Sequence, residues 1–171
     1  AYGYRVVDDP GNVQVFPPAW HRDIVEKIYN SMGVKRVFFE SPPGVMRQVA
    51  GEAAVTVTVV PTYQRAVIEV KQYGEHTVSQ VNTILKDLCY QKMEQITLYL
   101  NLEDPVTGIL CRQFEELGFF FAGVLPFSHV GDALLLQYLN NVPIDYSKIK
   151  IVDGVGQEIL TYVESHDPNR K

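Results

Sequence analysis

Alternation of apolar and polar residues marks several strands along this chain. From position 96 to 102 every second residue is Ile or Leu, a spacing that puts these side chains on one face of a strand. Residues 55–59 alternate Val with Thr, whereas residues 66–70 are apolar except for Glu69, as in a central strand covered on both sides. In all, the pattern predicts strands at 13–16, 35–40, 53–60, 65–71, 96–102, 119–126 and 133–139.

Four further segments show the helical spacing of apolar residues. The first covers residues 21–32, and the second begins near Thr77, whose spacing to Gln80 fits a capping box. A third helix follows Asp104-Pro105 and ends at Gly118, and a short fourth is predicted at 158–163. Residues 1–12 are predicted to be a linker running into the first strand, and residues 166–171 are predicted to fray.

The order of these elements predicts the fold class. Strands and helices alternate in the second half, while the strands at 53–60 and 65–71 are joined by a short connection typical of a hairpin. We therefore predict that residues 1–171 form a single domain that mixes α and β structure (α/β in the broad sense), more specifically of the α+β class. Its sheet is mixed and largely antiparallel, with flanking helices.

Composition and charge exclude several classes of protein. The 171 residues are 46% hydrophobic and carry a net charge of −5, which suits a folded domain but not a general binder of nucleic acid or anionic membranes. No apolar run is long enough to cross a bilayer, and no secretory signal is visible. Cys89 and Cys111 show no metal-binding spacing, so we expect reduced thiols, no metal site and a cytoplasmic protein.

Three stretches between Arg65 and Leu139 resemble the GNAT superfamily of acyl-CoA N-acyltransferases. The loop Lys71-x-x-Gly74-x-His76 is similar to that family's pyrophosphate loop. The helix end running from Phe114 to Phe119, and the closing strand that begins at Asp132, are similar to the corresponding family segments. The resemblance implies a GNAT-like fold that binds acetyl-CoA or another acyl-CoA as substrate, and an enzyme of this family would transfer the acyl group to an amine.

A narrower resemblance concerns the apolar strands near the end of the domain. The run from Leu117 to Gly123, with that from Asp132 to Asn140, looks like an acyltransferase-like domain. That domain lies C-terminal to an anti-sigma-factor-type ATP-binding domain in some bacterial regulators. This resemblance implies a signalling role, with a signalling protein as partner, and a chain starting at Ala1 suits a domain of a longer protein.

The resemblance also implies which residues would contact an acyl-CoA. The strand before the loop would pair with the pantetheine amides, and the loop and helix start would bind the pyrophosphate. The residues so implied are Val67, Ile68, Val70, Lys71, Gly74, Glu75, His76, Thr77 and Thr107. Glu75 adds a negative charge and His76 adds bulk where phosphates must sit, with partial compensation from Lys71. An ordinary strand-to-helix turn is the alternative interpretation of the loop.

Few residues are candidates for the chemistry of acyl transfer. Glu69 is the best candidate for a general base, because it interrupts an apolar strand. The alternative is a glutamate that pairs with a nearby Arg or points at the mouth of the cleft. His129, in a turn, is a second candidate for a catalytic role, and a solvated loop histidine is the alternative interpretation. Phe114 stands where the family often has the tyrosine that acts as general acid, and Tyr99 is a possible substitute.

These features leave two functions open. One is an acyl-CoA N-acyltransferase acting on an amine; the other is a catalytically degenerate GNAT-like sensor or docking module of a signalling protein. Homodimerisation is possible in either case. Binding of CoA, whether by an enzyme or by a sensor, requires two predicted strands to separate beside the loop. These are the strands at 65–71 and 96–102.

Overall fold

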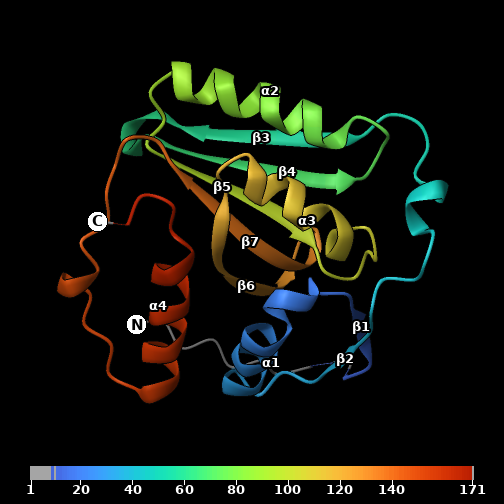
Figure 1. The fold of residues 1–171 in the computed structure, drawn as a ribbon, viewed down its shortest axis with the longest axis horizontal. Coiled ribbons are helices and arrows are strands. Elements are labelled where there is room, and N and C mark those ends of the chain that lie inside the picture. The colour runs from blue at the N-terminus through green and yellow to red at the C-terminus, as the bar shows by residue number, and fades with distance from the viewer. Residues whose placement is uncertain (1–8, 10, 171) are drawn as a thin grey trace.

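The computed structural model describes Asp9 and residues 11–170, and its centre is a five-stranded sheet (Figure 1). The strands lie in the order β3-β4-β5-β7-β6, with only β4 and β5 parallel. Their bounds are β3 Ala54–Val60, β4 Arg65–Gln72, β5 Gln95–Asn101, β6 Phe120–Ser128 and β7 Gly131–Leu139. The predicted class, an α+β domain with a largely antiparallel sheet and flanking helices, is confirmed.

Helices α2 (Thr77–Tyr90) and α3 (Thr107–Glu116) cover one face of the sheet. Parallel neighbours need a crossover connection, and α2 supplies it between β4 and β5. Alternate residues of β5 join the apolar positions of both helices in one core: Val81, Leu85, Leu88, Ile96, Leu98, Leu100, Leu110 and Phe114. The opposite face of β5, which carries Thr97 and Tyr99, is only half-buried.

Helices α1 (Arg22–Ser31) and α4 (Gly154–His166) pack against each other and against β6 (Figure 1). Helix α4 is much longer than the predicted segment at 158–163. Asp153 explains its start, because this carboxylate caps the helix by accepting a hydrogen bond from the amide of Gly156.

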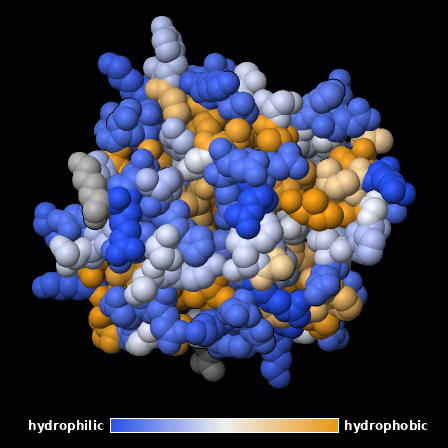
Figure 2. Space-filling model, viewed as in Figure 1, coloured by the Kyte–Doolittle hydropathy of each residue, from blue (hydrophilic) through white to orange (hydrophobic). Residues whose placement is uncertain are grey.

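Figure 2 shows the surface in the same view, where hydrophilic side chains cover most of the area and apolar groups form small separate patches.

The first two strands do not join the main sheet. Strand β1 (Val13–Val15) pairs in parallel with β2 (Arg36–Phe38), which is shorter than the predicted strand at 35–40. The amide of Phe16 donates a hydrogen bond to the carbonyl oxygen of Leu102 at 2.7 Å, so this small pair is attached to the end of β5. Strand β3 therefore forms the edge of the main sheet.

The segment after α4 differs from the prediction of a frayed tail at 166–171, as far as the described residues reach. Asp167 is buried and accepts a hydrogen bond from the hydroxyl of Tyr146 at 2.9 Å. The guanidinium of Arg170 lies 3.2 Å from the carboxylate of Glu164. These polar contacts fix the segment to the preceding loop and to α4. Most of the predicted linker at 1–12 lies outside the described residues.

The hairpin of β6 and β7 is longer than its sequence pattern predicts. β6 continues to Ser128 and β7 starts at Gly131, whereas the predicted strands are 119–126 and 133–139. The run Phe119, Phe120 and Phe121 is buried, with 2%, 2% and 0% exposure respectively. These three aromatic side chains therefore belong to the interior, and Phe120 offers no exposed surface for docking.

Candidate functional site

Glu69 lies in the middle of β4 and faces the half-buried side of the sheet. Thr56 of β3 and Tyr99 of β5 are its neighbours in register. The hydroxyl of Thr56 donates to Glu69 Oε2 at 3.0 Å, and Lys71 Nζ lies 3.8 Å from the same oxygen. Glu69 is only 8% exposed. Its carboxylate nevertheless has both a hydrogen-bond donor and a cation beside it.

His129, from the turn between β6 and β7, completes the surroundings of Glu69. Its Nε2 contacts Glu69 Oε1, although the two residues are 60 positions apart in the chain. The imidazole side chain is 65% exposed, so one side of the ring contacts the buried carboxylate and the other faces solvent. The structure thus joins two residues that the sequence offered only as separate candidates.

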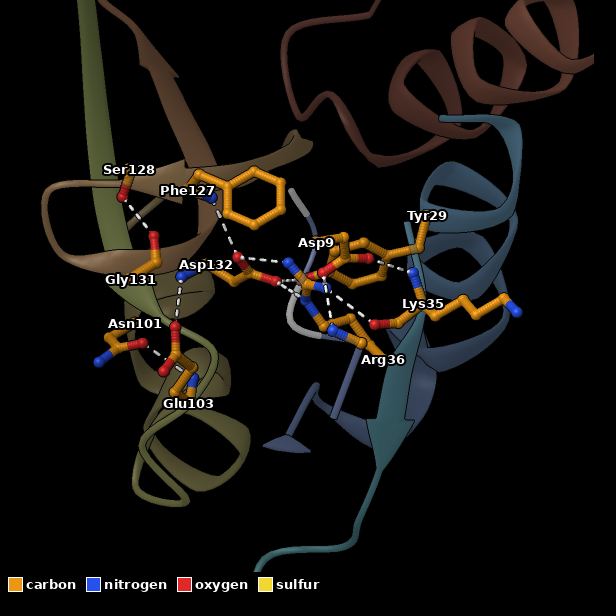
Figure 3. A network of polar contacts seen from close by, with 11 residues as sticks. Asp9, Tyr29, Lys35, Arg36, Asn101, Glu103, Phe127, Ser128, Gly131 and Asp132 are labelled. Atoms are coloured by element: carbon orange, nitrogen blue, oxygen red, sulfur yellow. Dashed lines mark hydrogen bonds and ion pairs between the residues drawn. The ribbon is translucent and has the colours of Figure 1, made fainter. Parts of the chain in front are cut away.

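A network of polar contacts fixes the turn that carries His129 (Figure 3). Asp132, at the start of β7, accepts hydrogen bonds from the hydroxyl of Tyr29 at 2.8 Å and from the amide of Phe127 at 3.0 Å. The amide of Asp132 in turn donates to Glu103 Oε1 at 2.9 Å. Gly131 has a φ of +87°, and a Cβ there would lie 2.6 Å from Glu103 Oε1. The turn therefore depends on a glycine and a buried carboxylate.

Tyr99 supplies a possible proton donor next to this pair. Burial, together with the negative charge of Glu69, raises the pKa of the Tyr99 hydroxyl, which therefore keeps its proton. The tyrosine that the resemblance associates with a general acid is Phe114 here, and its side chain is completely buried in the core. Of the two positions, Tyr99 alone can donate a proton.

The loop between β4 and α2 is closely packed. A Cβ on Gly74 would lie 2.4 Å from the amide nitrogen of Ala53, so the segment 51–53 passes directly over this glycine. The amide of Glu75 donates to the carbonyl oxygen of Gly51 at 3.2 Å and is therefore already occupied. The capping-box prediction is wrong: Thr77 is the first residue of α2, and its hydroxyl bonds to Gly74.

A cavity of about 490 Å³ opens where α2 begins, on the helix-covered side of the sheet. We refer to it as the α2 cavity; its lining includes Gly74, Glu75, His76, Thr77, Leu110 and Gln113. The amides at a helix start favour anions, but Glu75 and His76 bring the charge and bulk that the sequence indicated. Lys71 does not line the cavity, because it lies on the opposite face beside Glu69.

The parallel strands β4 and β5 part near their ends. Their pairing runs from Arg65 opposite Gln95 to Val70 opposite Leu100, and β4 then continues beside β3 alone. We call the region beyond this last pair the β4–β5 opening. The expectation that Val67, Ile68 and Val70 offer a free strand edge is wrong, since all three are paired on both sides.

Tyr73, which the sequence did not single out, lies in the β4–β5 opening, just after the end of β4. Its side chain is buried, and its hydroxyl is 2.7 Å from Thr107 Oγ1. Thr107 donates its own hydrogen to the carbonyl oxygen of Asn101, so Tyr73 is the donor in the first contact. Thr107 is completely buried, and its hydroxyl is occupied by these two hydrogen bonds. It is therefore not accessible to a ligand, contrary to what the resemblance implies.

Comparison with known proteins adds no family or relative. No family model matches this chain, and no curated protein sequence matches it significantly. Among the residues that the structure describes, no helix has the length and apolarity needed to span a membrane. The features that bear on function are therefore the His129–Glu69 pair, the α2 cavity and the β4–β5 opening.

Proposed function

We propose that this domain binds an acyl-CoA and transfers its acyl group to an amine in the cytoplasm. The observation that carries the proposal is the contact between His129 and Glu69 next to the β4–β5 opening. A buried carboxylate that accepts a hydrogen bond from an exposed imidazole is an arrangement suited to general base catalysis. The resemblance of the loop and strands to acyl-CoA N-acyltransferases supports the same reaction.

The positions of the cavity and the pair support this assignment. The α2 cavity is on the helix-covered side of the sheet, and the His129–Glu69 pair is on the other side. Glu69 lies one position before Val70, which is the last residue of β4 that pairs with β5. A pantetheine chain running through the β4–β5 opening would connect pyrophosphate in the cavity with a thioester near the pair. Tyr73 would have to move aside for this.

In this proposal His129 acts as the base and Glu69 orients it. His129 Nε2–H donates to Glu69, which leaves Nδ1 with a lone pair to take a proton from the attacking amine. The amine nitrogen forms a bond to the thioester carbonyl carbon, and the carbon–sulfur bond then breaks. Tyr99, which is in register with Glu69, would give its proton to the departing thiolate. The products are an amide and free CoA.

The experiment is a thiol-release assay with acetyl-CoA, using spermidine and a lysine-containing peptide as acceptor probes. We expect amine-dependent release of CoA, reduced about 100-fold or more in Glu69→Gln and in His129→Asn. Glu158→Gln is the control, because this exposed carboxylate on α4 pairs, among the described residues, only with Lys27. Full activity of both site variants would refute the assignment of base and orienting residue.

A second function, a sensor or docking module without turnover, is favoured by the packing at the loop. Tyr73 bonds across to Thr107, and Gly51 already occupies the amide of Glu75. Such a module would bind a CoA ester or a signalling protein in place of catalysing transfer. A thermal shift with CoA, but without thiol release, would support a CoA sensor. No shift at millimolar CoA would refute both CoA-dependent functions.

A further inference from the structure

Three potential metal ligands of different chemical types meet where the start of α1 approaches α3. His21, Cys111 and Glu115 each offer one donor atom, and these atoms all lie within 4.8 Å of one another. His21 and Cys111 are completely buried, and the side chain of Glu115 is 14% exposed. Sequence spacing did not reveal this cluster, because the histidine is far along the chain from the two residues on α3.

The hydrogen bonds of Tyr162, on α4, determine which ring nitrogen of His21 carries a hydrogen. The single hydroxyl hydrogen of Tyr162 is donated to the carbonyl oxygen of Trp20 at 2.9 Å. The contact of 2.8 Å between Tyr162 and His21 Nδ1 must therefore use a hydrogen on Nδ1. In a neutral ring, Nε2 is then the nitrogen with the lone pair.

This lone pair faces a second electron-rich atom. His21 Nε2 lies 2.7 Å from Glu115 Oε1, and neither a neutral imidazole nitrogen nor a carboxylate oxygen brings a hydrogen to the contact. A proton or a metal ion must therefore lie between the two atoms, and such a proton can belong to the ring or to the Glu115 carboxyl. Burial of both groups makes that requirement stricter.

Glu115 also presents an oxygen that the protein does not satisfy. Among the described residues Oε2 is buried without a hydrogen-bond partner, and the nearest cation, Arg112 Nη1, is 3.7 Å away. The other oxygen accepts a hydrogen bond from Trp20 Nε1 at 3.3 Å. Cys111 precedes Glu115 by one helical turn and thus lies on the same side of α3. An extra cation at the cluster would satisfy Oε2.

We propose that His21 Nε2, Cys111 Sγ and the Glu115 carboxylate bind a divalent transition-metal ion of the zinc class. One imidazole, one thiolate and one carboxylate form a donor set that zinc accepts in tetrahedral sites. Tyr162 orients the imidazole through its second nitrogen, as partners of ligating histidines commonly do. A cavity of about 330 Å³ lies beside the cluster, and Trp20, Glu115 and His166 are among its lining residues. His21 and Cys111 do not line it, so a water molecule as fourth ligand would enter from the Glu115 side.

The test uses cobalt as a spectroscopic substitute for zinc. The full chain is dialysed against a chelator and titrated with Co²⁺, and we expect a thiolate-to-cobalt charge-transfer absorption in the near ultraviolet. Cys111→Ala and Cys111→Ser should both remove this absorption. The chain offers a matched control in Cys89→Ala, since Cys89 is the other free cysteine and lies outside the cluster. Circular dichroism of each variant reports on its folding.

A further variant tests the orienting role of the tyrosine. Tyr162→Phe should keep the charge-transfer absorption but weaken cobalt binding by about 10- to 100-fold, the usual effect of removing a partner of a metal ligand. The proposal is overturned if wild-type protein shows no such absorption, because a proton between His21 and Glu115 then suffices. It is equally overturned if the absorption survives in Cys111→Ser or disappears in Cys89→Ala.

Discussion

The guanidinium of Arg36 is completely buried against the carboxylate of Asp132, 96 positions later in the chain. Asp9 contacts the same guanidinium at 2.6 Å, and the rings of Tyr29 and Phe127 pack on it (Figure 3). Burial lowers the pKa of Arg36, but the hydrogen bonds that its guanidinium donates to both carboxylates outweigh this effect and raise the pKa overall. The N-terminal strand pair is thereby joined to the turn that carries His129.

Replacing Arg36 by Met should therefore destabilise the fold strongly. The substitution leaves Asp132 buried beside Tyr29 without its cation, and losing one partner of a buried pair costs about 3–5 kcal/mol. Lys27→Met is the control, because Lys27 and Glu158 form an exposed pair, which solvent screens, so its loss should change stability little. Urea unfolding gives both values. Equal losses in the two variants would show that burial of the Arg36 pair adds nothing.

The contacts of Asp9 predict a loss of stability in acid. Burial alone raises the pKa of this carboxyl, but hydrogen bonds from the Lys35 amide and from Arg36 outweigh it, and the pKa falls below its usual value. The contribution is thus fully present above about pH 4, the unfolded value, and is lost as the pH drops through the lower folded value. Asp9→Asn should flatten this part of the stability curve. An unchanged slope below pH 4 would contradict the assignment.

Gly74→Ala tests whether the packing over the pyrophosphate-like loop is as tight as the structure indicates. An added Cβ meets the backbone of Ala53 at 2.4 Å, and overpacking of this kind costs about 1–3 kcal/mol. Gly154→Ala is a matched control, because no atom lies within 4 Å of its added Cβ and its φ is not positive. At the start of α4, alanine should stabilise the protein by about 0.5–1 kcal/mol. Thermal unfolding should show opposite signs for the two variants.

The sequence predicts the parts of the fold that depend on local spacing. The alternation over 96–102 and the helical spacing after Thr77 correspond closely to β5 and α2, since burial of one face repeats along each element. The pairing of β1 with β2, away from the main sheet, is not encoded locally. It depends on contacts such as that between Phe16 and Leu102.

The candidate site is predicted less completely. Glu69 stands out as a charge in an apolar strand, but its contact with His129 arises only when β4 and the β6–β7 turn meet. Tyr73 gave no signal, because tyrosine next to glycine is common in ordinary loops. The cluster of His21, Cys111 and Glu115 could not be predicted from the sequence either. Its residues come from separate elements, and only the fold brings their donor atoms together.

Tyr73→Ala tests whether the tyrosine keeps the β4–β5 opening closed. If a CoA chain must displace this side chain, the wild-type protein binds only in a minor conformation, and its apparent affinity falls by the population of that conformation. Removing the ring should then tighten CoA binding about tenfold or more, as measured by isothermal titration calorimetry. The ring is buried, so the same variant should lose about 3–5 kcal/mol of stability.

Tyr73→Phe separates the ring from its hydroxyl. This variant loses only the hydrogen bond to Thr107, so it should cost about 1 kcal/mol of stability and leave CoA affinity close to that of wild type. Tight binding in Tyr73→Ala alone would assign the blockage to the ring. If both variants bound CoA more tightly, the bond to Thr107 would be what holds the opening shut. Unchanged or weaker binding by Tyr73→Ala would mean that CoA, if it binds, does not pass this residue.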